Sequence, residues 1–214
     1  DFKDNIDENF AGVMITNPNT CGLFETDIVK ISELAHKSGG YLYCDGANFN
    51  AVVGKLKPGD LGIDAMHINL HKTFSTPHGG GGPGSGPVVF SNRLEKFCPT
   101  PLVKNIKGDF ILVEASNEKD LTKSFGRLNV FHGQMGMFVR AMSYMLSHGA
   151  DGLKQVSEDA VLNANYLRAS LSSHLTPAFD GFCMHEILFS DDFLKDTGVE
   201  TLDFAKAMID EGYH

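Results

Sequence analysis

Two short apolar segments flank a stretch of helical periodicity near the start of the chain. Gly12–Thr16, "GVMIT", and Tyr41–Asp45, "YLYCD", have the length and apolar content of buried strands. Between them, Thr26 is placed to cap a helix and Gly39 to end it. The apolar residues with helical spacing are Ile28, Ile31, Leu34 and Ala35. A strand, a helix and a strand within about 35 residues predict a parallel βαβ unit and hence an α/β fold.

Further strand patterns follow this unit. Apolar and polar residues alternate with period two through Ala65–Leu70, which predicts a third strand with Lys72 at or just past its end. Gly86–Phe90 predicts another short strand, and the alternating stretch Asp109–Val113 predicts one more. The expected sheet is therefore of the parallel type and contains at least the first three of these strands.

The second half of the chain is dominated by helical patterns. One amphipathic face ends near Gly149, and its apolar members, methionines included, are predicted to pack in the core: Met137, Phe138, Ala141, Met142, Met145 and Leu146. A second helix follows, with the apolar face Val156, Ala160, Val161, Ala164, Leu167 and Leu171. Beyond Pro177, a strand at Phe182–Phe189 and a helix at Leu202–Glu211 predict a small α+β portion.

The patterns divide the chain near residue 150. Residues 1–150 are predicted to form part of a larger α/β domain, and residues 151–214 a linking helix and part of a smaller domain. The chain begins with Asp1 rather than methionine and stops at His214 directly after an amphipathic segment. Both ends are therefore expected to be cut, so that the native N-terminus is not present.

Composition excludes several classes of function. A formal net charge of −9 and a pI near 5.4, without a cluster of basic residues, argue against nucleic acid as a partner. The apolar runs are shorter than the roughly 20 residues that span a bilayer, so no membrane segment is expected. The four cysteines are widely scattered and show no C-x-x-C pair, which favours isolated thiols over a disulfide framework.

Polar side chains follow the predicted strands at their carboxyl ends, where ligands gather in open parallel sheets. Asn17 follows the first strand, Asp45 ends the second, and His71 and Lys72 end the third. Asp45 and Lys72 could form a buried ion pair. They could equally hold pyridoxal phosphate, because a neutral lysine amine condenses with its aldehyde and an acidic partner keeps its ring nitrogen protonated. The residues alone leave both interpretations open.

Four segments carry a resemblance to a known family: "TNPNTCGLFE", "YLYCDGANFNAVVG", "GDLGIDAMHINLHKTFSTPHGGGGPGSGP" and "CMHE". Together they resemble the C-terminal half, or separate second subunit, of the glycine cleavage system P-protein, from about Val13 to the last residue. A lone lysine or a lone D-G-A would be a weak signal. The block around Lys72 with its glycine-rich continuation is long and highly specific.

The resemblance implies the large domain of fold type I pyridoxal-phosphate enzymes, with residues 1–150 as part of that domain. Lys72 would be the internal aldimine lysine, Asp45 the partner of the pyridine nitrogen, and Ala47 would pack against one face of the ring. Asn17 matches a position that reaches the ring oxygen, and His71 is a candidate for contacting cofactor phosphate or substrate. The phosphate-binding loop of the family pattern would lie upstream of Asp1, so this chain is expected to be inactive alone.

The implied activity is that of the aminomethyl-transferring, decarboxylating glycine dehydrogenase. Glycine would lose its carboxylate as CO2, and the aminomethyl group would pass to the lipoyl arm of H-protein. The resemblance further implies a dimeric or heterotetrameric assembly, in the bacterial cytoplasm or the mitochondrial matrix. The glycine-rich stretch from His78 to Pro87 would approach the site closely, whereas a mobile surface loop is the plain alternative.

Two other functions stay open on the residues alone. Another pyridoxal-phosphate enzyme, such as an aminotransferase or a carbon–sulfur lyase, would fit if an arginine bound the substrate carboxylate; the candidates are Arg127, Arg140 and Arg168. A non-catalytic scaffold is the third hypothesis. The remaining histidines are expected to be structural or unremarkable: His67, His132, His148 and His174. His185 and Glu186 would point to opposite faces of a strand, so no metal site is expected.

Overall fold

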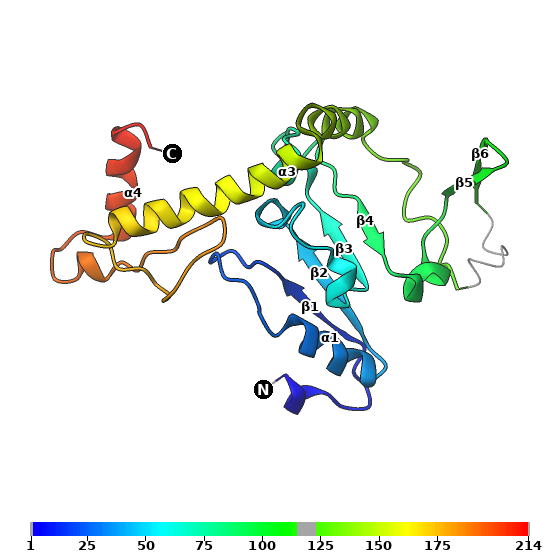
Figure 1. Cartoon of the computed structure of the whole chain (residues 1–214), viewed down its shortest axis with the longest axis horizontal. Coiled ribbons are helices and arrows are strands. Elements are labelled where there is room, and N and C mark those ends of the chain that lie inside the picture. Colours follow the sequence, from blue (N-terminus) through cyan, green and yellow to red (C-terminus); the bar gives the residue numbers. More distant parts are fainter. Residues whose placement is uncertain (1, 115–122, 214) are drawn as a thin grey trace.

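The computed structural model describes residues 2–114 and 123–213 (Figure 1). Its centre is a four-stranded sheet in the order β1-β2-β3-β4. The strands are β1 (Gly12–Thr16), β2 (Tyr41–Gly46), β3 (Ala65–Ile68) and β4 (Val88–Phe90). β1, β2 and β3 are parallel, whereas β4 is antiparallel to β3. The predicted βαβ unit is confirmed.

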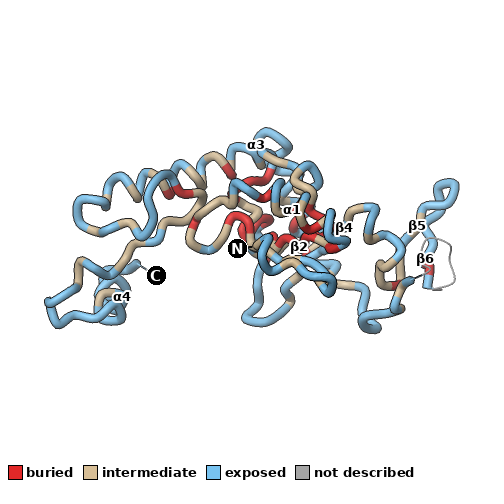
Figure 2. Tube along the Cα trace, turned by 90° about the horizontal axis from the view of Figure 1, so that it is seen from below, coloured by how far each residue is buried: buried red, intermediate tan, exposed pale blue. Residues whose placement is uncertain are grey.

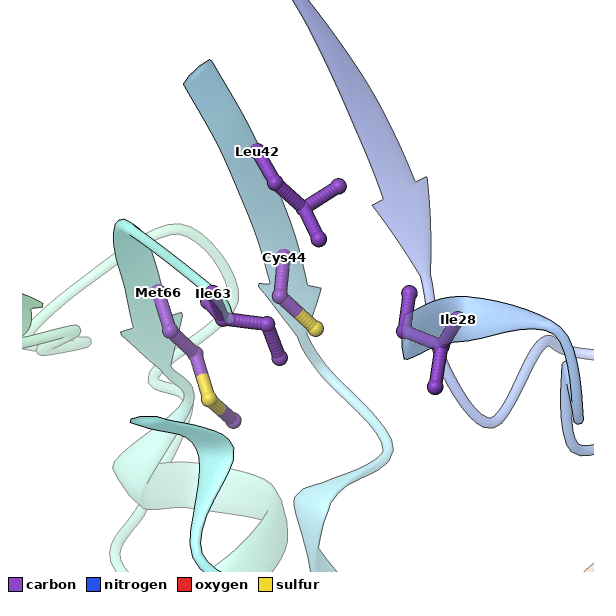
Figure 3. Packing of buried hydrophobic residues seen from close by; sticks show 5 residues of the cluster. All are labelled: Ile28, Leu42, Cys44, Ile63 and Met66. Atoms are coloured by element: carbon purple, nitrogen blue, oxygen red, sulfur yellow. The ribbon is translucent and has the colours of Figure 1, made fainter. Parts of the chain in front are cut away.

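Helix α1 (Ile28–Lys37) covers one face of the sheet (Figure 1). Five buried side chains gather between this helix and strands β2 and β3 (Figure 3): Ile28, Leu42, Cys44, Ile63 and Met66. The helix ends as predicted, since Gly39 adopts a φ of +82° that favours glycine. The prediction for Thr26 is wrong, because Asp27 is the N-cap residue and makes no capping hydrogen bond through its side chain.

The two predicted helices are confirmed as the two halves of the long element α3 (Met135–Leu171). Gly149 has non-helical backbone angles and separates the halves by a kink, at the break that the sequence predicted. The first half packs on a second core with the short helix α2 (Leu70–Thr73): Val53, Leu70, Phe74, Met137 and Ala141. Beyond the kink, the buried Ser157 hydroxyl donates to the Val53 carbonyl oxygen over 2.8 Å. α3 therefore runs across the predicted domain boundary near residue 150, which stays a prediction.

The remaining elements lie outside the two cores. β5 (Leu102–Ile106) and β6 (Asp109–Val113) form a separate antiparallel hairpin, of which only β6 was predicted. α4 (Thr201–Asp210) confirms the last predicted helix. Figure 2 shows that the buried chain is concentrated around the sheet and α3, whereas the hairpin and α4 are largely exposed. Short 3-10 helices occur at Lys3–Asn5, Phe49–Ala51, Pro58–Leu61, Asn92–Phe97 and Asp192–Leu194.

Three further sequence predictions are wrong. The third strand ends at Ile68, and Leu70 opens α2 because it packs in the second core. Phe182–Phe189 is not a strand and makes only an isolated bridge between Phe189 and Pro177. Met142, Met145 and Leu146 are exposed on α3, because the described residues place no second layer over that side of the helix.

A buried carboxylate joins β2, β3 and β4. Asp64 accepts hydrogen bonds from the Leu42 backbone N–H, from Ser91 and from Arg93, and pairs with His36 at 2.8 Å. Burial by itself raises the pKa of Asp64, but these donors outweigh burial and hold the pKa below its ordinary value. This network anchors the amino ends of β2 and β3, away from the strand ends that were predicted to bear the site.

Among residues 2–114 and 123–213, no helix is long and apolar enough to cross a membrane. All four cysteines are free thiols.

Candidate active site

The carboxyl ends of three parallel strands lie side by side at one edge of the sheet (Figure 1). In the register, Thr16 of β1 pairs with Asp45 of β2, and Asp45 pairs with His67 of β3. Asn17 follows β1 directly, and α2, which carries His71 and Lys72, follows β3. The backbone thus brings the predicted site residues to one edge, which we call the rim.

The Asp45 carboxylate has two neighbours at the end of β2, a backbone N–H that donates to it and an imidazole. Its Oδ1 accepts the Ala47 backbone N–H at 2.8 Å and lies 3.1 Å from His67 Nε2. Its other oxygen, Oδ2, has no hydrogen-bond partner in the described part of the chain. Gly46 permits this geometry, because a Cβ there would lie 2.1 Å from the His67 carbonyl oxygen. The D-G-A sequence therefore fixes one carboxylate oxygen and leaves the other available.

His67 connects Asp45 to Tyr43. His67 Nδ1 lies 2.8 Å from the Tyr43 hydroxyl, and the two rings are 5.8 Å apart between centroids. Burial, followed by the charges of Asp45 and Cys44, raises the pKa of Tyr43. Sequence analysis treated His67 as structural and missed its contact with a candidate site residue. The alternation of Tyr43 and Asp45 on one face of β2 was the available signal.

Lys72 lies in α2, just past the end of β3, and is exposed. Its amine has no carboxylate within 4.0 Å among the described residues, and Asp45 contacts His67 instead. The alternative of an ion pair between Asp45 and Lys72 is therefore not realised. An accessible amine without a charge partner is available for covalent chemistry.

Unpartnered polar atoms lie on residues that flank Lys72 in the sequence. His71 Nδ1 is buried without a hydrogen-bond partner, as are the side-chain oxygens of Asn69, Thr73 and Thr76. The His71 ring meets His78 edge-on at 4.6 Å. Burial, then the charges of His78 and Lys72, lowers the pKa of His71, so its imidazole is neutral at neutral pH. Buried polar atoms without partners mark a place where a polar ligand can supply the missing bonds.

Asn17 organises the loop that follows β1. Its side-chain Oδ1 accepts the Glu25 backbone N–H at 2.9 Å, and its Nδ2 donates to the Glu25 carbonyl oxygen at 3.3 Å. Asn48 ties the same loop to β2 by donating to the Pro18 carbonyl oxygen at 3.0 Å. An amide group retains one further N–H and one further lone pair. Asn17 is thus at the rim as predicted, and its first hydrogen bonds go to the protein itself.

The glycine-rich segment returns to the rim at its far end. The Leu70 backbone N–H donates to the Ser85 carbonyl oxygen at 3.2 Å, and the Ile68 N–H donates to that of Pro87 at 2.9 Å. The glycines between His78 and Ser85 are exposed, and a Cβ on Gly80 or Gly81 would meet open space. The segment is therefore anchored at both ends beside α2, and close approach to a ligand stays a prediction.

The segment Cys183–Glu186, "CMHE", also reaches the rim. The Met184 backbone N–H donates to the Gly22 carbonyl oxygen at 2.7 Å, and a Cβ on Gly22 would lie 1.9 Å from the Glu186 carbonyl oxygen. His185 is buried and its Nε2 lies 3.5 Å from Glu186 Oε1, so the expectation of opposite directions is wrong. It failed because the segment is not a strand. Burial, the largest cause, holds the pKa of His185 below its ordinary value. The charge of Glu186 opposes this shift, and the charge of Lys72 adds to it.

No group of three histidine, cysteine, aspartate or glutamate residues within the described ranges could hold a metal ion. The three candidate arginines are dispersed. Arg127 pairs with Glu114 at 2.7 Å beside the β5–β6 hairpin, Arg140 is exposed on α3, and Arg168 lies beyond the kink with a buried, unpartnered Nε. Neither Arg127 nor Arg140 is at the rim.

A match to a protein-family model shows which family the chain belongs to. The model of the glycine cleavage system P-protein matches residues 1–208. The chain belongs to the glycine cleavage system P-protein family. Relatives of this family include the "probable glycine dehydrogenase (decarboxylating) subunit 2" of Caulobacter vibrioides, 63% identical over the whole chain, and that of Kosmotoga olearia, 52% identical over 98% of it. The chain spans 41% and 42% of the lengths of these two relatives.

Solved structures confirm the fold. A crystal structure of glycine decarboxylase, the P-protein, in inhibitor-bound form superposes with a TM-score of 0.77, at 24% identity over 97% of this chain and 47% of that one. Sphingosine-1-phosphate lyase from Burkholderia pseudomallei superposes with a TM-score of 0.64, at 15% identity over 99% and 46% of the two chains. This chain thus has the α/β fold of fold type I pyridoxal-phosphate enzymes, with a mixed sheet.

The rim fits the cofactor of this fold. An aldehyde needs an accessible amine, and Lys72 has no carboxylate partner among the described residues. A protonated ring nitrogen needs an acceptor, and Asp45 has one oxygen free of described partners. The unpartnered nitrogen of His71 and the side-chain oxygens beside it can serve further polar groups.

Proposed function

We propose that this chain supplies the lysine- and aspartate-bearing part of the active site of a decarboxylating glycine dehydrogenase. The observation that carries the proposal is the rim, where Asp45 and Lys72 follow adjacent parallel strands in a member of the P-protein family. When bound, pyridoxal phosphate supplies the electron sink that decarboxylation of an amino acid needs. The protein supplies attachment, orientation and charge.

Lys72 is proposed to hold the cofactor covalently through its amine. Asp45 is proposed to accept a hydrogen bond from the ring nitrogen through Oδ2, and Ala47 to pack against the ring. The support for Asp45 is that Oδ1 is already occupied by the Ala47 N–H and His67. A fixed carboxylate presents its charge without reorganisation, which strengthens electrostatic stabilisation.

His71 is proposed to contact the cofactor phosphate or the substrate. Its lowered pKa keeps the ring neutral, so a neutral nitrogen can accept a proton or a hydrogen bond beside Lys72. Asn17 is proposed to reach the cofactor ring oxygen with the remaining hydrogen-bonding capacity of its amide. Both proposals are supported by placement at the rim.

Glycine and the lipoyl arm of H-protein are the proposed substrates, with CO2 as the first product. A dimeric or heterotetrameric assembly is proposed, since relatives of the chain are named as subunit 2 and the chain spans about two fifths of their length. The relatives are bacterial, and the bacterial cytoplasm is the proposed compartment.

The test follows the carboxylate of glycine in the full-length assembly that contains this sequence. With carboxyl-labelled glycine, pyridoxal phosphate and lipoylated H-protein, we expect labelled CO2 to be released. We expect Lys72→Ala to abolish release, and the matched variant Lys107→Ala, in the β5–β6 turn, to leave it unchanged. Transfer of the amino group to a keto acid without CO2 would establish an aminotransferase instead. Absence of both reactions would favour a scaffold.

A further inference from the structure

A chain of three side chains crosses the sheet face that carries Asp45. Tyr43 and Asp45 are two residues apart on β2 and share one face, and His67 is opposite Asp45 on β3. His67 Nδ1 lies 2.8 Å from the Tyr43 hydroxyl, and Nε2 lies 3.1 Å from Asp45 Oδ1. The imidazole thus bridges a phenol and a carboxylate, with one ring nitrogen for each.

The protons in this chain can be assigned from its chemistry. The raised pKa of Tyr43, caused first by burial, keeps its hydroxyl protonated at neutral pH. A phenol that donates to Nδ1 requires this nitrogen to be the acceptor, so a neutral imidazole carries its proton on Nε2. Nε2–H then faces Asp45 Oδ1, which lies 3.1 Å away. Each contact has a proton on one atom and a lone pair on the other.

The bridge controls the orientation of the carboxylate. Oδ1 accepts a hydrogen bond from the Ala47 N–H and lies 3.1 Å from His67 Nε2, whereas Oδ2 has no partner in the described part of the chain. Rotation of the carboxylate would break the hydrogen bond and move Oδ1 away from the imidazole. The side chains of His67 and Asp45 are only 23% and 24% exposed, so water competes weakly for these contacts. Gly46 keeps β2 and β3 close enough for the contact.

From these contacts we infer that His67, held by Tyr43 as its Nε2–H tautomer, is a positioning residue that fixes Asp45 so that Oδ2 receives the cofactor ring nitrogen. The inference rests on the proposed function, in which Asp45 contacts this nitrogen. It adds a role for two residues that do not touch the cofactor. Comparable outer hydrogen bonds orient the ligands of many protein sites.

The test uses the full-length assembly loaded with pyridoxal phosphate labelled with 15N in its ring. We expect the NMR signal of the ring nitrogen to show a protonated nitrogen in the unmodified protein. In His67→Leu this signal should be partly lost, and the dissociation constant of the cofactor should rise about tenfold. His67→Gln should retain the protonated signal, because its amide can donate to Oδ1. His174→Leu, at an exposed histidine, is the matched control.

An unchanged ring-nitrogen signal and unchanged cofactor retention in His67→Leu would overturn the inference. A second measurement needs no cofactor. In the cofactor-free assembly labelled with 15N-histidine, we expect His67 as the Nε2–H tautomer, with its Nδ1 resonance displaced in Tyr43→Phe. A dominant Nδ1–H tautomer would overturn the inference, whether or not the cofactor binds at Lys72. Failure of the cofactor to bind at Lys72 would refute the proposed function separately.

Discussion

Strand β2 and the β5–β6 hairpin are both regular β-structure, yet the chain uses them differently. In β2 every second residue is buried under α1, with Leu42 fully buried, and the intervening residues include Tyr43 and Asp45. In β6 only Val113 is buried, and Phe110 is 75% exposed. A strand that is covered on one face holds the polar groups of its other face in fixed places. Pairing without a covering layer does not position a site in this way.

The deepest side chain of β2 provides the sharpest contrast. We expect Leu42→Ala to lower the local free energy of unfolding by about 4 kcal/mol, because it leaves a cavity in the core of Figure 3. Phe110→Ala, on the exposed hairpin, should change it by about 0.5 kcal/mol or less. Hydrogen exchange of the β2 amides in the full-length protein measures both. Equal effects would mean that the hairpin is packed as tightly as the sheet.

Removal of the buried Asp64 carboxylate should cause the next largest loss of stability. We expect Asp64→Ala to cost about 3 kcal/mol, since it leaves Arg93 and the Leu42 N–H without their partner, whereas Asp109→Ala on the hairpin should cost little. The pKa of Asp64 is lowered in the folded state. Its contribution is therefore complete above its ordinary pKa of 3.8 and is lost as the pH falls through the folded value.

Unfolding followed from pH 7 down to pH 2 measures this dependence. The difference in free energy of unfolding between the unmodified protein and Asp64→Ala should stay constant down to about pH 4 and shrink below it. A difference that grows as the pH falls would contradict the assigned direction of the pKa shift.

Substitution of two glycines tests the difference between a packed turn and an open turn. Gly22 has a φ of +77° and faces the Glu186 backbone, whereas Gly108, in the hairpin turn, has a φ of +101° and open space around it. We expect Gly108→Ala to cost about 1 kcal/mol from its backbone angle alone, and Gly22→Ala about 2 kcal/mol. The excess should appear as faster exchange at the Met184 amide, which donates to Gly22. Equal costs would show that Cys183–Glu186 is not held at the rim.

The smallest effect concerns the surface contact between α3 and the turn after β2. Lys55 Nζ lies 2.6 Å from Glu158 Oε1, but both side chains are about two fifths exposed. We expect Lys55→Met to cost about 0.5 kcal/mol or less, and less still in 1 M salt. Ser157→Ala, which removes the buried bond to Val53, should cost about 1 kcal/mol. The reverse order would contradict the view that burial sets the strength of this contact.

Sequence patterns predicted the βαβ unit because each of its signals was local. The apolar runs of β1 and β2 and the left-handed turn at Gly39 need no knowledge of tertiary contacts. The end of β3 was misjudged because its alternation continues to Leu70. The spacing of Leu70 and Phe74, four residues apart and both buried in the second core, was the signal of a helical turn.

The sequence predicted which residues follow the ends of the strands, but not the contacts that those residues make in the site. The sequence places Asp45 and Lys72 after adjacent strands, but their roles stay predictions. The bridge through His67 depends on the register between β2 and β3, which local patterns do not contain. His185 was misjudged because its direction was inferred from a strand that does not form.

The most direct test of the central claim is to find which lysine holds the cofactor. The full-length assembly is incubated with pyridoxal phosphate, reduced with borohydride, digested and mapped by mass spectrometry. The account predicts a single reduced adduct on Lys72, lost in Lys72→Ala while Lys55 and Lys107 stay unmodified. An adduct on another lysine, or none in the complete assembly, would contradict the assignment of the rim as the active site.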